Sequence, residues 1–359
     1  MTTTSIEKKA EGLSPTAWVV AGILLLAGIV GAIVQFTKGM SVTGLNQQIV
    51  WGLYIAGFFT AAAAGAGLLT LVGISEFKEI VPKGSRVKLL AMALASFITA
   101  GVLILLDIGA PLQAWRIITT FSFSATETWD FWVLFAVIVI ALVYLLATRK
   151  ASGATKILGI LGIIAALALI VVESLMLGQQ AAHPLWGGMT MLTFLLSMFV
   201  AGLALALILW GTGETGKSLR SWLMVGLVAS LAIVFSEVLT GVVSGNTRLN
   251  EEVGSLLGGT TSPFFWFHVV VGLLLPIALL LTASSKTKAI LIGALALLGV
   301  LADKLWILVA GQEKPVLALP KASYFPSWVE FLVILGAIGL AWLIYIVLTK
   351  YIWPKEITA

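Results

Sequence analysis

The chain has 359 residues, of which 60% are hydrophobic and only 10% are charged, with a net charge of +5 at pH 7. A soluble domain normally carries about 25% charged residues, so this composition excludes a soluble globular protein and indicates an integral membrane protein. The sequence contains no cysteine, so it can form no disulfide and cannot hold an iron–sulfur cluster through thiolates.

Ten continuous apolar runs are each long enough to cross a bilayer as a helix, which takes roughly 20 residues. They do not alternate in polarity, which argues against a membrane β-barrel. The first run follows two lysines, as a signal peptide would, but its length and the lack of a cleavage motif predict a retained helix. The expected spans are 17–36, 50–76, 87–108, 128–148, 154–177, 189–212, 219–244, 263–284, 287–311 and 328–352. The predicted fold is an all-α, polytopic bundle that forms a single membrane domain over 1–359.

Lysine and arginine are unevenly divided between the two sets of connections. The N-terminus, the connection after every second span and the C-terminus hold most of them. The other connections are longer and hold few, namely Lys38, Arg116, Arg248, Lys314 and Lys321. By the positive-inside rule, this distribution predicts a protein of the cell membrane with both termini cytoplasmic and the long loops extracytoplasmic.

Ionisable residues of the spans gather toward the outer, extracytoplasmic ends. Each costs about 2.5 to 3.5 kcal/mol at a helix centre on insertion scales, so such residues mark functional sites unless they reach interfacial water. The set is Asp107, Asp130, Glu173, Glu237, His268, Asp303 and Lys304, with Arg116 and His183 just above. We expect a polar cavity in the outer half. Asp303 and Lys304 are consecutive and point about 100° apart on a helix, so we expect them not to pair.

The spans also show signs of an internal repeat. One span starts with Trp51-Gly52 and another is preceded by Trp186-Gly187, and two spans finish in Gly-Gln, at Gly178-Gln179 and Gly311-Gln312. We expect two four-helix bundles of the same orientation, at 50–178 and 186–312, flanked by helices in 1–49 and 313–359. Parallel repeats also occur in transporters, so the repeat alone does not select a function.

The run "AAAAGAG", residues 61–67, places small side chains on every face of the second span. Small residues let neighbouring helices approach closely in a membrane. Two interpretations remain open: a tightly packed central helix, or a helix that lines a ligand cavity.

Four longer stretches of the sequence share the pattern of a known family. They are "GLNQQIVWGLYIAGFFTAAAAGAG", "LLDIGAPLQAWRI" followed by "TETWDFW", "SPFFWFHVVVGLLLP" and "YFPSWVEFLVILGAIGLAWLIYI". These stretches resemble the NrfD/PsrC-like family, the membrane subunits of polysulfide-reductase-type and related respiratory complexes. The ten spans are similar to the longer branch, found with hydrogenase, menaquinone-reductase and alternative-complex-III-type assemblies.

The resemblance implies a subunit with no haem and no iron–sulfur cluster of its own. Such a subunit binds menaquinone or another quinone near the outer face and exchanges electrons with an iron–sulfur subunit docked there. A catalytic subunit of molybdopterin or hydrogenase type would complete the complex. One position departs from the family motif D-x-G-x-P-x-R-x-W, because "DIGAPLQAW" has Gln113 at the basic position, with Arg116 directly after Trp115.

Quinone reduction takes two electrons and two protons, so its site needs an apolar slot, hydrogen-bond donors and acids in contact with water. We expect the head group near Gln48, Trp51 and Tyr54, with Trp129 and His183 also contributing to binding. Trp115 and Arg116 are expected on a short interfacial helix, Gln113 to Phe121, that meets the partner or caps the quinone entrance. No metal site is expected.

Asp107 is the first candidate for the proton-transfer carboxylate, with a helix-end role as the alternative. His268 has the chemistry for proton exchange near neutral pH, with an interfacial histidine as the alternative. Glu237 and Glu173 are expected to extend a proton path through the bundles.

Three other classes of protein remain open. A secondary transporter would agree with ten spans and a repeat. Such proteins tend to have helices interrupted by Gly or Pro at the midplane, whereas the prolines of this sequence lie mostly in the outer loops, with Pro276 as the exception. A b-type haem protein would need both histidines, His183 and His268, for one haem. A purely structural anchor would leave the outer cluster of ionisable residues unexplained.

Overall fold

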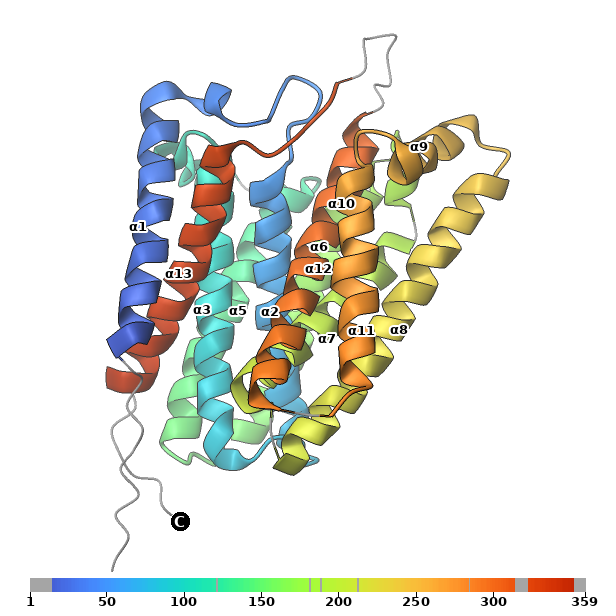
Figure 1. Cartoon of the computed structure of the whole chain (residues 1–359). Coiled ribbons are helices and arrows are strands. Elements are labelled where there is room, and N and C mark those ends of the chain that lie inside the picture. The colour runs from blue at the N-terminus through green and yellow to red at the C-terminus, as the bar shows by residue number, and fades with distance from the viewer. Residues whose placement is uncertain are drawn as a thin grey trace, which may run out of the picture.

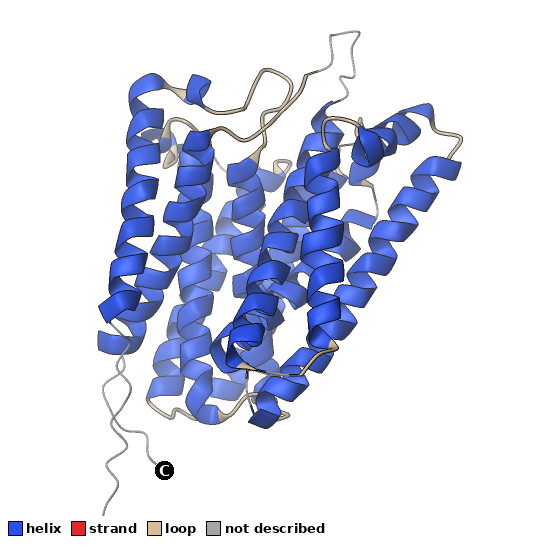
Figure 2. Cartoon of the chain, viewed as in Figure 1, coloured by secondary structure: helices blue, strands red, loops and turns tan. Residues whose placement is uncertain are grey.

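The computed structural model describes residues 15–120, 122–180, 182–187, 189–211, 213–283, 285–313 and 322–351. All regular structure in these residues is helical, as Figure 2 shows. Ten helical segments in the described part of the protein are long and apolar enough to span a membrane. The predicted all-α, polytopic fold is therefore confirmed.

The spanning helices are α1 (Pro15–Lys38), α2 (Leu53–Ser75), α3 (Lys83–Asp107), α5 (Thr126–Arg149), α6 (Thr155–Gly178), α7 (Met189–Trp210), α8 (Gly213–Val243), a composite of α10 (Ser262–Trp266), η4 (Phe267–Leu274) and α11 (Leu275–Leu280), α12 (Lys286–Glu313) and α13 (Trp328–Tyr351). Short helices lie in the connections: η1 (Met40–Val42), η2 (Pro111–Gln113), α4 (Arg116–Thr119), η3 (Pro184–Trp186) and α9 (Thr247–Gly258).

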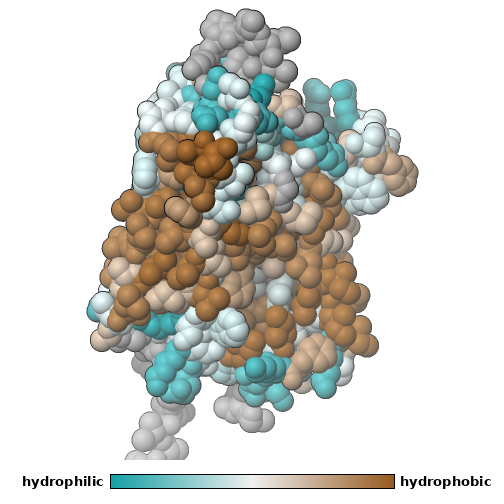
Figure 3. Space-filling model, turned by 90° about the vertical axis from the view of Figure 1, so that its right-hand side faces the viewer, coloured by the Kyte–Doolittle hydropathy of each residue, from teal (hydrophilic) through white to brown (hydrophobic). Residues whose placement is uncertain are grey.

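The bundle has two distinct ends (Figure 1). One end, here called the loop face, carries the connections with η1, α4, η3 and α9. The opposite end, the termini face, holds the start of α1 and the end of α13. A broad apolar belt crosses the middle of the molecule, with hydrophilic residues toward both ends (Figure 3). This distribution is the one a helical bundle needs in a bilayer.

Helix α2 lies at the centre of the bundle, packed against α3, α6, α7, α12 and α13. In its most apolar stretch of 18 residues, 83% of the residues are buried, whereas in that of α1 only 11% are buried. Gly67 packs directly on the backbone of Gly202 in α7, so a β-carbon at either glycine would collide with the other helix. The small residues of α2 therefore serve close helix packing, the first of the two interpretations left open by the sequence.

The remaining helices surround α2 in two groups. Helices α2, α3, α5 and α6 pack together, and α7, α8, the α10–η4–α11 helix and α12 form the second group. Helix α1 pairs with α13, which also contacts α3. Contacts of α7 with α2 and α6, and of α12 with α2, join the groups. The relation of the two groups by an internal repeat, with the boundaries given above, stays a prediction.

A buried ion pair connects α2 to α3 at the termini face. Arg86 Nη1 lies 3.0 Å from Glu76 Oε2, and each side chain is 7% exposed. Arg86 Nη2 also donates to Ser75 O at the end of α2. Tyr144 of α5 donates to the second oxygen of Glu76 at 2.9 Å. Three helices are thus fixed at this end by one network.

The helix that follows α9 changes its winding inside the membrane. Residues Phe267–Leu274 form a π-helical stretch, and Pro276 lies two residues further on. Proline lacks the N–H that an α-helix would use at that point, so the local backbone cannot keep a regular hydrogen-bond ladder. Such π stretches occur frequently at functional sites. Residue His268 is buried in this segment.

Candidate functional site

A first polar group lies at the loop face around the end of α3. Asp107 is its last residue, half-buried, and its Oδ1 atom is buried without a hydrogen-bond partner among the described residues. Tyr54, buried in the first turn of α2, donates its phenol to Gln35 Oε1 at 2.8 Å. Gln35 Nε2 in turn donates to Leu106 O at 2.8 Å, next to Asp107. Asp107 and Tyr54 both lie within Coulombic range of Glu330.

Glu330, in the first turn of α13, receives hydrogen bonds from three groups in two connections. Its Oε1 accepts from the Tyr324 phenol at 2.6 Å, and its Oε2 accepts from the backbone N–H of Gly44 at 2.7 Å and of Ser327 at 2.8 Å. Ser327 Oγ accepts from the Glu330 N–H, which completes a reciprocal capping box. The Tyr324 oxygen also accepts from Leu53 N at 2.8 Å, at the start of α2.

Burial and the neighbouring Glu330 carboxylate raise the pKa of the Tyr324 phenol above its ordinary value. The phenol therefore stays neutral and remains a hydrogen-bond donor at physiological pH. We call Gln35, Tyr54, Asp107, Tyr324 and Glu330 the Asp107 site. Asp107 and Tyr54 were expected from the sequence, and the other three were not. The only sequence signal for Glu330 was the capping pattern "SWVE", which looks like an ordinary helix start.

Trp51 and His183, both predicted to bind the quinone, contact the same tryptophan ring, that of Trp186. The Trp51 and Trp186 rings stack at 6.0 Å between centroids, and His183 packs on Trp186 at 4.5 Å. Gln312 at the end of α12 accepts from Trp51 N at 3.0 Å and donates to Trp51 O at 2.9 Å. Burial and the positive charge of Arg248 lower the pKa of His183, which keeps the ring neutral near pH 7. This aromatic contact joins the two helix groups at the loop face.

The other four predicted binding residues lie on the loop-face connections or in the first turn of α5. Gln48 is half-buried in the turn before α2, where its N–H donates to Asn46 Oδ1 at 3.0 Å. Trp129 is 38% exposed and donates to Phe123 O at 3.0 Å. Trp115, at 59% exposure, and the exposed Arg116 lie at the start of α4.

The predicted interfacial helix from Gln113 to Phe121 is wrong in its length. The structure has a single turn, α4, preceded by η2, which ends at Gln113. Phe121 itself lies outside the described residues. Pro111 is the first residue of η2, so the backbone turns twice in short helices before α5 rather than forming one continuous helix.

A second polar group lies within the membrane belt, and we call it the buried charge cluster. Its six members come from five helical segments: α5, α6, α8, η4 and α12. Five of them are at most 4% exposed, and Glu237 is half-buried. The members are Asp130, Glu173, Glu237, His268, Asp303 and Lys304.

Asp303 and Lys304 form an ion pair, contrary to the expectation from their helical positions. Lys304 Nζ lies 2.9 Å from Asp303 Oδ2 and 3.7 Å above the Phe194 ring. The long lysine side chain bends back across the helix surface to reach the carboxylate. A fully buried ammonium group cannot be solvated by water, so it needs a charged partner within the protein. The 100° angle between consecutive α-carbon directions was therefore a poor guide to the position of the charged atoms.

Longer-range electrostatic contacts connect the rest of the cluster. Glu173 lies within Coulombic range of Asp130 and Lys304, and neither of its carboxyl oxygens has a hydrogen-bond partner among the described residues. Glu237 lies within Coulombic range of Asp303 and Lys304. The cluster thus crosses from the first helix group to the second. The predicted acids are divided between two sites, with Asp107 in one and Glu173 and Glu237 in the other.

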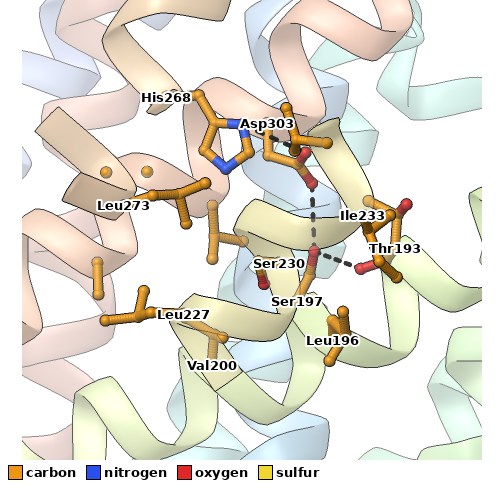
Figure 4. Close-up of a pocket in the computed structure, with 15 residues that line it drawn as sticks. Thr193, Leu196, Ser197, Val200, Leu227, Ser230, Ile233, His268, Leu273 and Asp303 are labelled. Atoms are coloured by element: carbon orange, nitrogen blue, oxygen red, sulfur yellow. Dashed lines mark hydrogen bonds and ion pairs between the residues drawn. The ribbon is translucent and has the colours of Figure 1, made fainter. Parts of the chain in front are cut away.

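His268 lies at the edge of a small cavity in the second helix group, drawn in Figure 4. The cavity measures about 20 Å³, room for roughly one water molecule. Its lining comes from α7, α8, η4 and α12. Asp303 and Ser197 both line it, and Ser197 Oγ donates to Asp303 Oδ2 at 3.2 Å. Apolar side chains form much of the remaining wall, among them Val200, Leu227 and Leu273.

Four carboxyl groups and a histidine share the cluster with one lysine. Burying several like charges together in a membrane is costly, so some of these groups must carry protons. A set of buried acids beside a cavity with room for a water molecule can store and transfer protons. The fold and the two sites therefore define a polytopic membrane protein with buried ionisable groups in the half nearer the loop face.

Comparison with known proteins defines the class further. Residues 41–315, well over half of the sequence, match the family described as polysulphide reductase, NrfD, and the protein belongs to this family. The resemblance seen in the sequence motifs is thereby confirmed. NrfD proteins are membrane subunits of oxidoreductases.

Three relatives align over most of their length. The protein is 24% identical to a subunit of the selenate reductase of Mesobacillus selenatarsenatis, covering 81% of its own sequence and 80% of the relative. It is 25% identical to an Hdr-like menaquinol oxidoreductase integral membrane subunit of Archaeoglobus fulgidus, covering 87% and 86%. It is also 25% identical to one polypeptide of the polysulfide reductase of Wolinella succinogenes, covering 74% and 95%. These relatives are subunits of multi-subunit reductases.

Proposed function

We propose that the protein is the quinone-reactive membrane subunit of an oxidoreductase complex. It exchanges electrons between the quinone pool and an iron–sulfur subunit docked on the loop face, and its own side chains handle the protons. The NrfD family and the relative named as a menaquinol oxidoreductase subunit support menaquinone as the quinone. The positive-inside distribution supports an extracytoplasmic loop face and cytoplasmic termini.

The observation that carries the proposal is the unpartnered Oδ1 of Asp107. A buried carboxyl oxygen that finds no hydrogen-bond partner among the described residues is unusual and calls for an explanation. A quinone carbonyl or quinol hydroxyl at this position would supply the missing partner and would exchange a proton with the carboxyl group. Asp107 holds that proton, and Tyr54 and Gln35 fix the position of the neighbouring end of α3.

The neutral Tyr324 phenol has a supporting role at the same site. It connects Glu330 with the first N–H of α2, so the starts of α2 and α13 keep a fixed separation beside Asp107. A fixed entrance is what a ring-shaped apolar substrate needs in order to be held in one orientation. Trp51, stacked on Trp186, and His183, packed against the same ring, form the aromatic surface on the side of the second helix group.

Electrons pass between the quinone and the partner, because a sequence without cysteine offers no thiolate ligand for a cluster of its own. We place the iron–sulfur subunit on the loop face, where the exposed Trp115 and Arg116 are available for contact. Tryptophan and arginine are enriched at protein interfaces. A catalytic subunit, of molybdopterin or hydrogenase type, would supply or consume the electrons.

The buried charge cluster extends proton handling beyond the Asp107 site. Glu173, Glu237 and His268 are the members we assign to proton transfer within the bundle. Their depth supports this role, since His268 lies six residues below the start of α10, or about 9 Å along the helix. Polar residues at such depth that do not reach water are retained for function rather than for anchoring.

The proposal is tested by quinone-dependent electron transfer in the detergent-purified native assembly. Wild type is compared with Asp107→Asn at matched subunit content, after retention of the iron–sulfur partner has been verified. The exposed Glu214→Gln at the termini face serves as a matched control that also removes a carboxylate. We expect Asp107→Asn to lose quinone turnover while the clusters remain reducible, and Glu214→Gln to behave as wild type.

Two outcomes would contradict the proposal. Unchanged turnover in Asp107→Asn would remove this carboxylate from the mechanism. A wild-type assembly that contains no iron–sulfur partner and shows no quinone activity would overturn the function itself and favour the transporter interpretation.

A further inference from the structure

The His268 ring lies between two partners that compete for one of its nitrogens. Trp306 Nε1 donates to His268 Nδ1 at 3.0 Å, and Trp306 is completely buried. On the other side, Asp303 Oδ1 lies 3.6 Å from the same nitrogen and has no hydrogen-bond partner among the described residues. The rings of His268 and Trp306 are nearly parallel, at 23°. A small rotation of His268 would exchange one partner for the other.

The chemistry of Trp306 determines where His268 carries its proton. An indole N–H is a donor only, so the nitrogen that receives its hydrogen bond must be bare. A neutral imidazole with a bare Nδ1 carries its proton on Nε2. Figure 4 shows the second ring nitrogen of His268 turned toward the cavity. In the resting arrangement the Nε2–H group therefore faces the cavity, and Nδ1 faces Trp306.

The charged surroundings of His268 come from two elements. Helix α12 contributes Asp303 and Lys304, and α8 contributes Glu237, which lies within Coulombic range of both. The residues of α7 that line the cavity bear hydroxyl or apolar groups only. Among the described residues, Asp303 is the carboxylate in position to take a hydrogen bond from Nδ1, and Lys304 holds its other oxygen at 2.9 Å.

We propose that Trp306 is a positioning residue: its N–H holds His268 in the Nε2–H tautomer, and His268 passes a proton between Asp303 and the cavity only when Nδ1 exchanges Trp306 for Asp303. The inference rests on the proposed proton-transfer role of the buried charge cluster. It assigns the gate of that transfer to an uncharged residue that no charge pattern in the sequence marks.

The transfer step is balanced in protons. A proton that has reached Asp303 moves from Oδ1 to Nδ1 as the hydrogen bond from Trp306 breaks. The proton on Nε2 then leaves to a water molecule in the cavity. One proton enters the ring and one leaves it, so the ring is neutral before and after. While the Trp306 hydrogen bond holds Nδ1, the ring cannot accept the proton and the gate is closed.

The test is the nitrogen-15 spectrum of the histidine rings in the full-length protein, labelled with [15N]histidine and reconstituted in lipid nanodiscs. A bare ring nitrogen and an N–H nitrogen have well-separated chemical shifts. The sequence contains only two histidines, so His183→Gln assigns the His268 signals. We expect wild-type His268 at pH 7 to have a bare Nδ1 and a protonated Nε2. The opposite tautomer in wild type would overturn the proposal.

Trp306→Phe keeps an aromatic ring and removes the N–H. We expect the proton of His268 to move to Nδ1, facing Asp303, because two lone pairs at 3.6 Å would otherwise repel each other. Trp222→Phe, at an exposed position on α8, is the matched control and should leave the spectrum unchanged. A Trp306→Phe spectrum identical to wild type would refute the positioning role.

Asp303→Asn provides a second variant in case Trp306→Phe does not fold. It retains the Trp306 donor, so the Nε2–H tautomer should persist at pH 7. At pH 5 we expect a smaller share of His268 rings protonated on both nitrogens than in wild type, because the cation has lost its acceptor. An equal or larger share would contradict the exchange of partners. None of these spectra requires quinone turnover, so failure here is distinguishable from failure of the proposed function.

Discussion

Replacing Arg86 by methionine provides a sharp test of how much the buried ion pair at the termini face contributes to stability. Methionine retains much of the arginine's apolar stem and removes the guanidinium group. Its loss leaves the Glu76 carboxylate at 7% exposure with only the Tyr144 phenol as a partner among the described residues. Breaking a buried pair on one side costs about 3 to 5 kcal/mol, which is roughly two to four powers of ten in the unfolding equilibrium.

The protein contains its own control for this effect. Lys217 and Glu214 form an ion pair of 2.7 Å, shorter than the 3.0 Å of the Arg86 pair, but their side chains are 73% and 87% exposed. Exposed pairs contribute little because water and salt screen them. Lys217→Met should therefore leave stability unchanged. Burial, rather than the distance between the charges, is the variable that this comparison isolates.

The assay is unfolding in mixed micelles of increasing SDS content, followed by tryptophan fluorescence and helical circular dichroism. The double variant Arg86→Met with Glu76→Gln should be more stable than Arg86→Met alone, since it removes the stranded charge. If Arg86→Met unfolds at the same SDS fraction as Lys217→Met, the network does not stabilise the bundle and the reasoning from burial is refuted.

Three further predictions concern other parts of the fold. Gly67→Val should destabilise the bundle by about 1 to 3 kcal/mol, because α2 must move away from α7, whereas Gly84→Val meets open space; equal SDS unfolding of the two would contradict the packing. The raised pKa of Tyr324 means that the folded state keeps a proton that the unfolded protein loses above about pH 10. The free energy of unfolding should therefore fall from pH 9 to 11 in wild type, and it should fall less steeply in Tyr324→Phe. Equal slopes in the two proteins would count against this assignment. The lowered pKa of His183 means that just below about pH 6.5 the unfolded protein gains a proton that the folded protein does not. The free energy of unfolding should therefore fall on acidification, and His183→Gln should reduce that fall. Parallel curves of stability against pH for the two proteins would refute the assignment.

The ten spans were predictable from sequence because continuous apolar length is a strong signal that side-chain detail hardly affects. The depth of the ionisable residues was predictable for a related reason, since the position along a span gives the distance from the membrane surface. Asp107 and Tyr54 were found by motif, and Glu173, Glu237 and His268 by polarity. All five belong to one of the two polar sites in the structure.

The predictions that failed concern side-chain contacts between helices and side-chain positions within one helical turn. Glu330 and Tyr324 were missed because a capping box and an interfacial tyrosine have ordinary structural explanations at a helix start. Lys304 was judged by its α-carbon direction, although a side chain with four rotatable bonds can reach behind its own helix. The role of Trp306 was invisible because its partner, His268, is on a different helix.

The central position of α2 has a consequence for the order in which the protein can be made. Its mean hydropathy of 1.9 is the lowest among the ten spans of the described residues, against 2.6 for α1 and 2.7 for α5. It is synthesised second, yet its neighbours α7 and α12 leave the ribosome only after several further spans have been inserted. Until then, the face of α2 that will meet α7, with Gly67 on it, borders lipid, where small side chains hold a helix weakly. Biogenesis therefore passes through an early intermediate with an uncovered glycine face, and that intermediate is the stage at which an insertase or membrane chaperone would have the most to protect.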